Sequence, residues 1–291
     1  MTDFFDNRSG CAGCVDLHTH STASDGSDSP RELMRKAASL GLSVIALTDH
    51  DTLAGIPDAI DETKRIYMEG SKLKLVAGCE FSVSFAGKDV HLLGLFVNPD
   101  YAPLIALTHE AARSRDGRNN EMLSRFQKDG FLITEEELTG GVRTEITRAH
   151  FAKALVKKGY AKDYPDAFAR FLADDCYYYV KREYLDPAKV IRILHEAGGI
   201  AVLAHPLQYR FAPEKLRSMI EQFRSFGLDA METKYSAYSP SEEDLLRSLA
   251  FRYGLARSGG SDYHGTAKPG LQLGTGYGNG WCIRPEDVTV L

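Results

Sequence analysis

Histidine and aspartate residues are concentrated near the start of the chain, in the stretch VDLHTHSTASDG at positions 15–26. His18 and His20 lie two positions apart, so in an extended strand both side chains point to the same face, beside Asp16. Asp25 follows five residues later. Two adjacent imidazoles fit poorly into an apolar core, but they are good metal ligands. The spacing therefore predicts a metal site built on His18 and His20.

Ligand-type residues recur where later strand-like runs end. These residues are Asp49, His50, Asp51, Glu80, His91, His205, Asp262 and His264. Repeated strand–helix units favour a parallel sheet, closed or nearly closed into a barrel, whose strands end on one rim. Six of the nine histidines would then converge on one bowl. Buried there without metal, the set would carry large desolvation and repulsion costs, so a shared metal centre is predicted.

The elements that must position these residues alternate between helix and strand over most of the chain. The stretch SPRELMRKAASLG, for example, predicts a helix that Ser29 caps, Pro30 opens and Gly41 ends. The alternation stops between about Tyr101 and Glu183, where the segments have helical and charged patterns. We interpret residues 101–183 as a helical insert that covers the bowl, and residues 1–100 and 184–291 as the catalytic barrel.

Composition and charge limit the classes of function. A chain of 291 residues with 43% hydrophobic and 26% charged residues is typical of a globular protein with a full core. A net charge of -5 argues against a broad electrostatic surface for duplex nucleic acid. We expect a cytoplasmic protein with no membrane partner, because neither a long apolar run nor a signal-peptide pattern is present. Cys11 and Cys14 form half of a zinc-binding pattern, and the missing half predicts an incidental pair.

Six motifs together resemble the PHP (polymerase and histidinol phosphatase) family: DLHTHSTASDGS, ALTDHDT, GCEFS, VHLLG, LAHP and GSDYHG. The resemblance covers the chain from about Val15 to Gly265. It implies an α/β fold, a distorted (β/α)7 TIM-like barrel, with a cluster of two to three divalent metal ions. Mixed histidine and carboxylate ligands favour Mn²⁺, Zn²⁺ or Fe²⁺.

Carried over residue by residue, the resemblance implies three ligand sets. The first metal ion would be held by His18, His20, Glu80 and Asp262, the second by Glu80, His91 and His205, and the third by Asp25, His50 and His264. A hydroxide that bridges two metal ions would attack phosphorus, with His18, His20, Glu80, His205 and Asp262 as the catalytic residues. Asp16 and Asp49 are expected to orient the histidines.

The segment TRAHFAKAL is similar to a subgroup of stand-alone bacterial phosphoesterases in this family. Members hydrolyse the 3′-phosphate of nucleoside 3′,5′-bisphosphates, and some trim short RNA from its 5′ end. The expected partner is therefore a small phosphorylated nucleotide or a short oligonucleotide. Arg148 and His150 stand at a predicted helix start, a common anion site, and are expected to contact substrate together with Arg143. Lys181 and Arg182 are further basic candidates.

Four other functional hypotheses stay open at this point. The first is a histidinol-phosphate phosphatase, against which the helical insert and the Arg148–His150 pair argue. The second is a metal-dependent C–N hydrolase, in which three metal ions beside an arginine would be unusual. The third is an inactive metal- or nucleotide-binding module, against which the complete ligand set argues. The last is a polymerase-associated proofreading domain, which would have to act in trans.

Overall fold

Seven strands form one sheet in the order of the sequence. The computed structural model describes residues 13–139, 146–173, 175–278 and 280–291. The strands are β1 (Val15–Asp16), β2 (Val44–Leu47), β3 (Lys74–Phe85), β4 (Lys88–Leu95), β5 (Ile200–Leu203), β6 (Ala230–Tyr235) and β7 (Ala256–Gly260). The first and last strands also meet, because the Leu17 amide donates to the Gly259 carbonyl at 3.2 Å. The sheet is thus a nearly closed barrel, which confirms the predicted α/β fold class.

One strand runs against the expected direction. β4 pairs antiparallel with both β3 and β5, whereas the other neighbouring strands are parallel. Ala86 and Gly87 join β3 to β4 with φ values of 51° and 80°, which is the backbone of a tight hairpin turn. The expectation of an all-parallel sheet is therefore wrong at β4. The reversal places His91, near the start of β4, beside Ala204 at the end of β5, where the two residues share a 3.1 Å backbone hydrogen bond.

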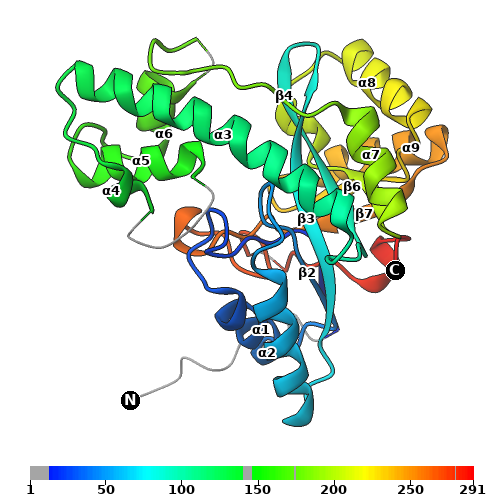
Figure 1. The fold of residues 1–291 in the computed structure, drawn as a ribbon. Helices are drawn as coiled ribbons and strands as arrows, with labels where there is room; N and C mark the ends of the chain where they lie inside the picture. The colour runs from blue at the N-terminus through cyan, green and yellow to red at the C-terminus, as the bar shows by residue number, and fades with distance from the viewer. Residues whose placement is uncertain (1–12, 140–145, 174, 279) are drawn as a thin grey trace.

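Helices pack around the outside of the barrel (Figure 1). They are α1 (Pro30–Ser39), α2 (Ile56–Met68), α7 (Pro187–Glu196), α8 (Pro213–Ser225) and α9 (Pro240–Tyr253), and short 3-10 turns lie at Pro206–Tyr209, Gly265–Ala267 and Pro285–Asp287. α1 begins as its sequence predicts, since the Ser29 and Glu32 side chains each accept a hydrogen bond from the other's backbone amide. Among the described residues, none of the helices has both the length and the apolar character that a membrane crossing requires.

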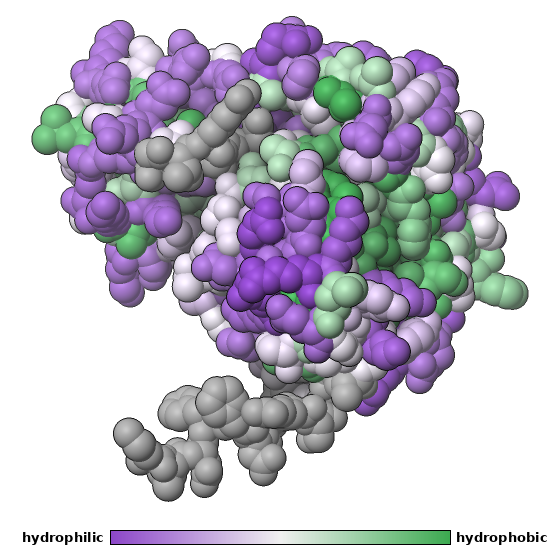
Figure 2. Space-filling model, turned by 60° about the horizontal axis from the view of Figure 1, so that its bottom comes forward, coloured by the Kyte–Doolittle hydropathy of each residue, from purple (hydrophilic) through white to green (hydrophobic). Residues whose placement is uncertain are grey.

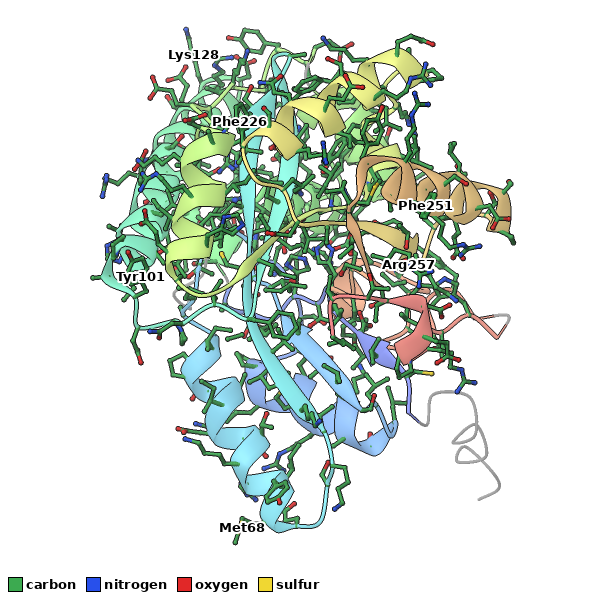
Figure 3. The ribbon with its side chains drawn as sticks, turned by 90° about the vertical axis from the view of Figure 1, so that its right-hand side faces the viewer. Met68, Tyr101, Lys128, Phe226, Phe251 and Arg257 are labelled. Atoms are coloured by element: carbon green, nitrogen blue, oxygen red, sulfur yellow. The ribbon has the colours of Figure 1, made fainter. Side chains whose placement is uncertain are left out.

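A second group of helices forms a lobe beside the rim of the barrel (Figure 1). It contains α3 (Ala102–Lys128), α4 (Glu135–Thr139), α5 (Arg148–Lys157), α6 (Tyr164–Ala167) and a π-helical turn at Phe168–Leu172. The lobe has its own apolar core, in which Phe126, Phe151 and Leu172 are fully buried. Figure 3 shows Tyr101 next to the start of α3 and Lys128 at its other end. The division of the chain into a catalytic barrel and an insert at residues 101–183 stays a prediction.

α2 packs against β3 but leaves part of the outer face of this strand uncovered. A groove of about 480 Å³ lies there, lined mainly by apolar side chains of α2 and β3, among them Ile60, Tyr67, Leu73 and Leu75. Figure 2, in which the bottom of the molecule comes forward, shows hydrophobic side chains gathered on one side of the surface in view. Met68, at the end of α2, is 85% exposed and points away from the barrel (Figure 3). The groove is thus an apolar surface between α2 and the start of β3.

A buried ion-pair cluster joins the lobe to the barrel. The carboxylate of Asp51, just after β2, accepts hydrogen bonds from Arg115 of α3 and from both terminal nitrogens of Arg182, the latter two at 3.1 Å. Burial alone would raise the pKa of Asp51, but Arg182 and Arg115 hold it well below its usual value. Asp51 also has a φ of 54°, a conformation that Asp and Asn tolerate better than most residues.

We expect Asp51→Asn to lower the free energy of unfolding at pH 7 by about 3–5 kcal/mol, because both arginines lose a buried counter-charge. The folded-state pKa of Asp51 is lowered, so its stabilisation is present above the unfolded pKa of about 3.9 and is lost as the pH falls below it. Denaturant unfolding of both proteins at pH 7 and at lower pH measures this difference, which should shrink in acid.

The matched control is Asp58→Asn, which removes one partner of Arg31, in a 2.6 Å ion pair that is about half exposed. An exposed pair of this kind stabilises a protein by less than about 1 kcal/mol. Equal losses in the two variants would contradict the role assigned to the Asp51 cluster.

Candidate metal centre and phosphate cavity

All nine predicted metal ligands lie together at the rim of the barrel. They are His18, His20, Asp25, His50, Glu80, His91, His205, Asp262 and His264. Glu80 is central, because its two oxygens lie 2.7–3.3 Å from ring nitrogens of five histidines. Oε1 faces His91 and His205, and Oε2 faces the other three. A single carboxylate therefore lies between five histidines from four other segments of the chain.

Two further carboxylates face the same histidines. Asp262 Oδ1 lies 3.3 Å from His20 Nε2 and 3.3 Å from His264 Nδ1. Asp25 Oδ1 lies 3.2 Å from His264 Nε2, and Asp25 Oδ2 lies 3.8 Å from His50 Nε2. The strand ends, and the loop that carries Asp25, thus bring acidic oxygens and imidazole nitrogens into one cluster.

The donor set fits divalent metal ions. Several buried atoms of the cluster have no hydrogen-bond partner among the described residues, namely His18 Nε2, both ring nitrogens of His20, Asp25 Oδ1, His50 Nδ1, Glu80 Oε2 and His205 Nδ1. Buried polar atoms rarely stay unsatisfied, and metal coordination would satisfy these. Three groups have ligand atoms within 4.8 Å of one another: His18, His20 and Glu80; His50, Glu80 and His91; and His20, Asp25, His50 and His264. His205 and Asp262 belong to none of the three groups.

Protons occupy part of this cluster when it holds no metal. Burial lowers the pKa of His20, but the carboxylates of Asp262 and Glu80, each 3.3 Å from its Nε2, outweigh burial and raise the pKa to about 9. The balance at His91 is similar, since burial is outweighed by Glu80 and Asp89 and the pKa rises to about 10. Metal binding must therefore displace protons, which makes metal affinity fall as the pH falls.

The backbone is strained at two of the predicted ligands. His205 has a φ of 28° and Asp262 a φ of 57°, in a region that residues other than glycine seldom occupy. Such strain persists where the surrounding structure holds a functional geometry in place. Each residue lies two positions after the end of a strand: His205 follows β5, and Asp262 follows β7.

Residues outside the predicted set orient the ligands. Glu232 of β6 holds two of them: its Oε1 lies 3.1 Å from His18 Nδ1, and its Oε2 accepts from the His205 amide at 2.7 Å. Tyr235 and Lys268 both donate to Asp262 Oδ2, at 2.8 and 2.5 Å. These contacts turn the other oxygen of Asp262 toward the histidines.

Among the described residues, neither Asp16 nor Asp49 makes a hydrogen bond to an imidazole ring, so their expected role in orienting the histidines stays a prediction. Asp49 accepts from the amide and the hydroxyl of Ser21, both at 2.7 Å, and from the Ser24 hydroxyl at 2.6 Å. Asp16 accepts from the amides of Ser261 and Gly274 and, at 3.5 Å, from the amide of His18. Short carboxylates readily bond nearby backbone amides and hydroxyls, and here they fix the loops that carry the ligands.

A cavity of about 660 Å³ opens onto the cluster. Its wall carries five cationic side chains, those of Arg115, Arg118, Arg148, Arg182 and Lys268. It also carries aromatic side chains, including Tyr164, Phe168, Tyr179, Tyr184 and Tyr277. Arginines recognise phosphate oxygens, and aromatic faces stack on nucleobases. The cavity therefore combines a metal-ligand cluster with groups suited to a nucleotide.

Among these five cations, Arg118 is the one without an ion pair in the described part of the chain. Neither Arg118 nor Arg115 was predicted from the sequence. Arg118 is 7% exposed, and its Nε has no hydrogen-bond partner among the described residues. Burial and the nearby charges of Arg115, Arg182 and Arg148 lower the pKa of Arg118 to about 9. A buried cation beside other cations stabilises a folded chain poorly, but it suits the binding of an anion.

The predicted substrate contacts have different surroundings. Arg148 lines the cavity, stacks over Tyr179 at 5.4 Å, and approaches Asp89 to 3.9 Å. His150 lines a smaller side pocket instead, and its Nδ1 accepts from the Thr147 amide at 3.0 Å. Lys181 is exposed and does not line the cavity. Arg143 lies outside the described residues, as does Cys11. The roles of these residues in substrate binding stay predictions.

Comparisons with known proteins agree with this geometry. A family model described as the PHP domain matches residues 16–180. A 5′-3′ exoribonuclease of Haemophilus influenzae is 35% identical over 249 residues, which cover 86% of this chain and 89% of the relative. A 3′,5′-nucleoside bisphosphate phosphatase of Chromobacterium violaceum is 29% identical, covering 89% of this chain and 90% of the relative. A solved structure assigned as a metal-dependent phosphoesterase, from Bifidobacterium adolescentis, is 30% identical with a TM-score of 0.81, covering 94% and 93% of the two chains.

Proposed function

This chain belongs to the PHP domain family and is a metal-dependent phosphoesterase, and we propose that it removes the 3′-phosphate from nucleoside 3′,5′-bisphosphates. Short 5′-phosphorylated RNA is the related substrate. The observation that carries the proposal is one cavity with two places for anions, the metal-ligand cluster and the arginine group around Arg118. A bisphosphate has one phosphate for each.

The contacts around Asp89 connect these two places. Its Oδ1 lies 3.6 Å from His91 Nε2 in the cluster, and its Oδ2 lies 3.9 Å from the Arg148 guanidinium. In this proposal we therefore assign Arg148 to the phosphate that reacts and Arg118 to the second phosphate. The aromatic side chains of the same wall are available to the base.

We propose that the cluster holds two to three divalent ions, of Mn²⁺, Zn²⁺ or Fe²⁺, through the three ligand sets implied by the family resemblance. When bound, such ions lower the pKa of water into the neutral range and neutralise charge on phosphoryl oxygens.

The chain's own residues position the reactants. The two oxygens of Glu80 lie within 3.3 Å of five imidazoles. Glu232 fixes the ring of His18 through the 3.1 Å hydrogen bond to its Nδ1. Lys268 and Tyr235 hold Oδ2 of Asp262, so that its Oδ1 faces the histidines of the cluster. Arg148 would neutralise negative charge on that phosphate as the bond to the 3′ oxygen breaks. In this proposal residues 101–183 supply the arginines and aromatic groups that recognise the substrate.

The competing hypotheses make different demands on the cavity. Histidinol phosphate carries one phosphate and no nucleobase, so it would leave the arginine group around Arg118 without a phosphate to bind. A C–N hydrolase would have no use for a phosphate-binding wall at all. The bisphosphate accounts for the cluster, the arginines and the aromatic faces together.

Phosphate release by protein loaded with Mn²⁺ tests the proposal. The substrates are adenosine 3′,5′-bisphosphate, adenosine 3′-phosphate, AMP and histidinol phosphate. We expect kcat/KM for the bisphosphate to exceed that for adenosine 3′-phosphate by about 10- to 100-fold, the effect of losing charge-assisted hydrogen bonds. Equal or faster turnover of AMP or histidinol phosphate would overturn the proposed substrate.

A further inference from the structure

A second, smaller pocket reaches the metal-ligand cluster from another direction. It has a volume of about 50 Å³ and is lined by Asp25, Gly26, Ser27, Ala149, His150, Lys153, Tyr164, Thr266 and Ala267. Four of these residues, Asp25, Ala149, Tyr164 and Ala267, also line the large cavity. The two spaces therefore meet at a shared wall, and the ligand-type residue in that wall is Asp25.

The walls of this side pocket are fixed, and its outer end is at the surface. Ser27 donates its amide to the His264 carbonyl at 3.1 Å and accepts from the Thr266 amide at 2.8 Å. Asp25 is held in place by Thr147, just before α5, which donates to Asp25 Oδ2 at 2.8 Å. Lys153 and Thr266 are exposed, so the pocket leads from the cluster to solvent.

The side pocket has hydrogen-bond donors that suit a phosphodiester chain. His150 Nδ1 accepts from the Thr147 amide, and burial lowers the pKa of this imidazole, so its Nε2 carries the proton. Lys153, one turn further along α5, adds a positive charge at the outer end. Contacts of this kind bind the backbone of a nucleic acid without reading its sequence.

The chemistry of the two related activities defines what such a pocket could accept. A bisphosphate phosphatase and an exoribonuclease that releases nucleoside 5′-phosphates can break the same bond, between the 3′ oxygen and phosphorus. The oxygen of water bonds to phosphorus, the 3′ oxygen leaves and gains a proton, and the phosphate stays on whatever it is attached to. In RNA that attachment is the 5′ oxygen of the next nucleotide.

We propose that the side pocket receives the downstream strand of a short 5′-phosphorylated RNA, starting at the 5′ oxygen of the second nucleotide. This inference rests on the proposed function, in which the first nucleotide fills the large cavity. The pocket has room for only a few water-sized groups, at about 10–15 Å³ each, so it accepts the O5′–C5′ link of the second nucleotide and leaves the sugar and base of that nucleotide outside. Lys153 then lies beside the following phosphate.

The test compares adenosine 3′,5′-bisphosphate with a 5′-phosphorylated tetra-adenylate RNA in the metal-loaded enzyme. We expect Lys153→Glu to lower kcat/KM for the RNA by about 5- to 10-fold, because a phosphate contact becomes a repulsion. Turnover of the bisphosphate should change by less than about twofold, since nothing extends into the side pocket. Thr266→Glu, which adds a negative charge on the other wall, should reproduce this selective loss.

Lys157→Glu is the matched control, because Lys157 is also exposed on α5 but does not line the pocket. It should leave both substrates unaffected. Unchanged RNA turnover in Lys153→Glu and Thr266→Glu overturns the inference, and so does an equal loss with both substrates. A wild-type enzyme that hydrolyses the bisphosphate but not the RNA also overturns it while the proposed function stands. Absence of bisphosphate turnover removes the proposed function first, and the inference with it.

Discussion

Glu80→Gln is expected to lower kcat/KM for adenosine 3′,5′-bisphosphate by about 10³-fold or more and to reduce the metal content of the purified protein. Both oxygens of Glu80 lie within 3.3 Å of histidine nitrogens, five rings in all. Glutamine keeps the shape of the side chain but removes its charge and replaces one ligand oxygen with an NH₂ group. Metal analysis and steady-state kinetics on one preparation measure both effects.

Glu62→Gln is the control for this substitution. Glu62 is also a fully buried carboxylate, but it lies on α2 and pairs with Arg35 at 2.6 Å, outside the cluster. We expect its substitution to affect stability while metal content and turnover stay at the wild-type level. Full metal content and activity in Glu80→Gln would show that Glu80 does not have the central position we assign to it.

Arg118→Met is expected to have the second largest effect, a loss of about 10- to 100-fold in kcat/KM for the bisphosphate, because a charged contact to the second phosphate disappears. Hydrolysis of adenosine 3′-phosphate, which lacks that phosphate, should change by less than about threefold. Metal content should not change, since Arg118 contacts none of the ligands in the described part of the chain.

The same variant should be more stable than the wild type. Arg118 is buried beside Arg115, Arg148 and Arg182, and removal of a poorly compensated charge is expected to raise the free energy of unfolding by about 1 kcal/mol. Arg113→Met, at an exposed position of the same helix, should change neither property. A loss of stability together with an equal loss for both substrates would mean that Arg118 supports the fold and does not bind phosphate.

The metal-ligand cluster could be predicted from the sequence because its geometry follows from the strands. Once the strand ends are located, a barrel places them on one rim, and residues as distant as His20 and His264 become neighbours. The error in the direction of β4 did not remove His91 from the rim, because this residue lies near the start of the reversed strand. The predicted grouping of these residues at the rim therefore held despite the error in the direction of β4.

The binding wall could not be predicted in the same way. Arg115 and Arg118 are three residues apart on α3, and a charged helix face of that kind is usually solvated. They become buried only because the lobe packs against the barrel through Asp51. Glu232 was missed for a related reason, since its partner His18 is 214 residues away and only the closed sheet brings the two together.

The most direct test of the account is a titration of metal-free protein with Mn²⁺, with bound metal and phosphate release from adenosine 3′,5′-bisphosphate measured on the same samples. The account predicts no turnover without metal, a rise in turnover as the cluster fills, and little response from Glu80→Gln at any metal concentration. Undiminished turnover by the metal-free protein in the presence of a chelator would contradict the central claim that this cluster hydrolyses phosphate esters by holding metal ions.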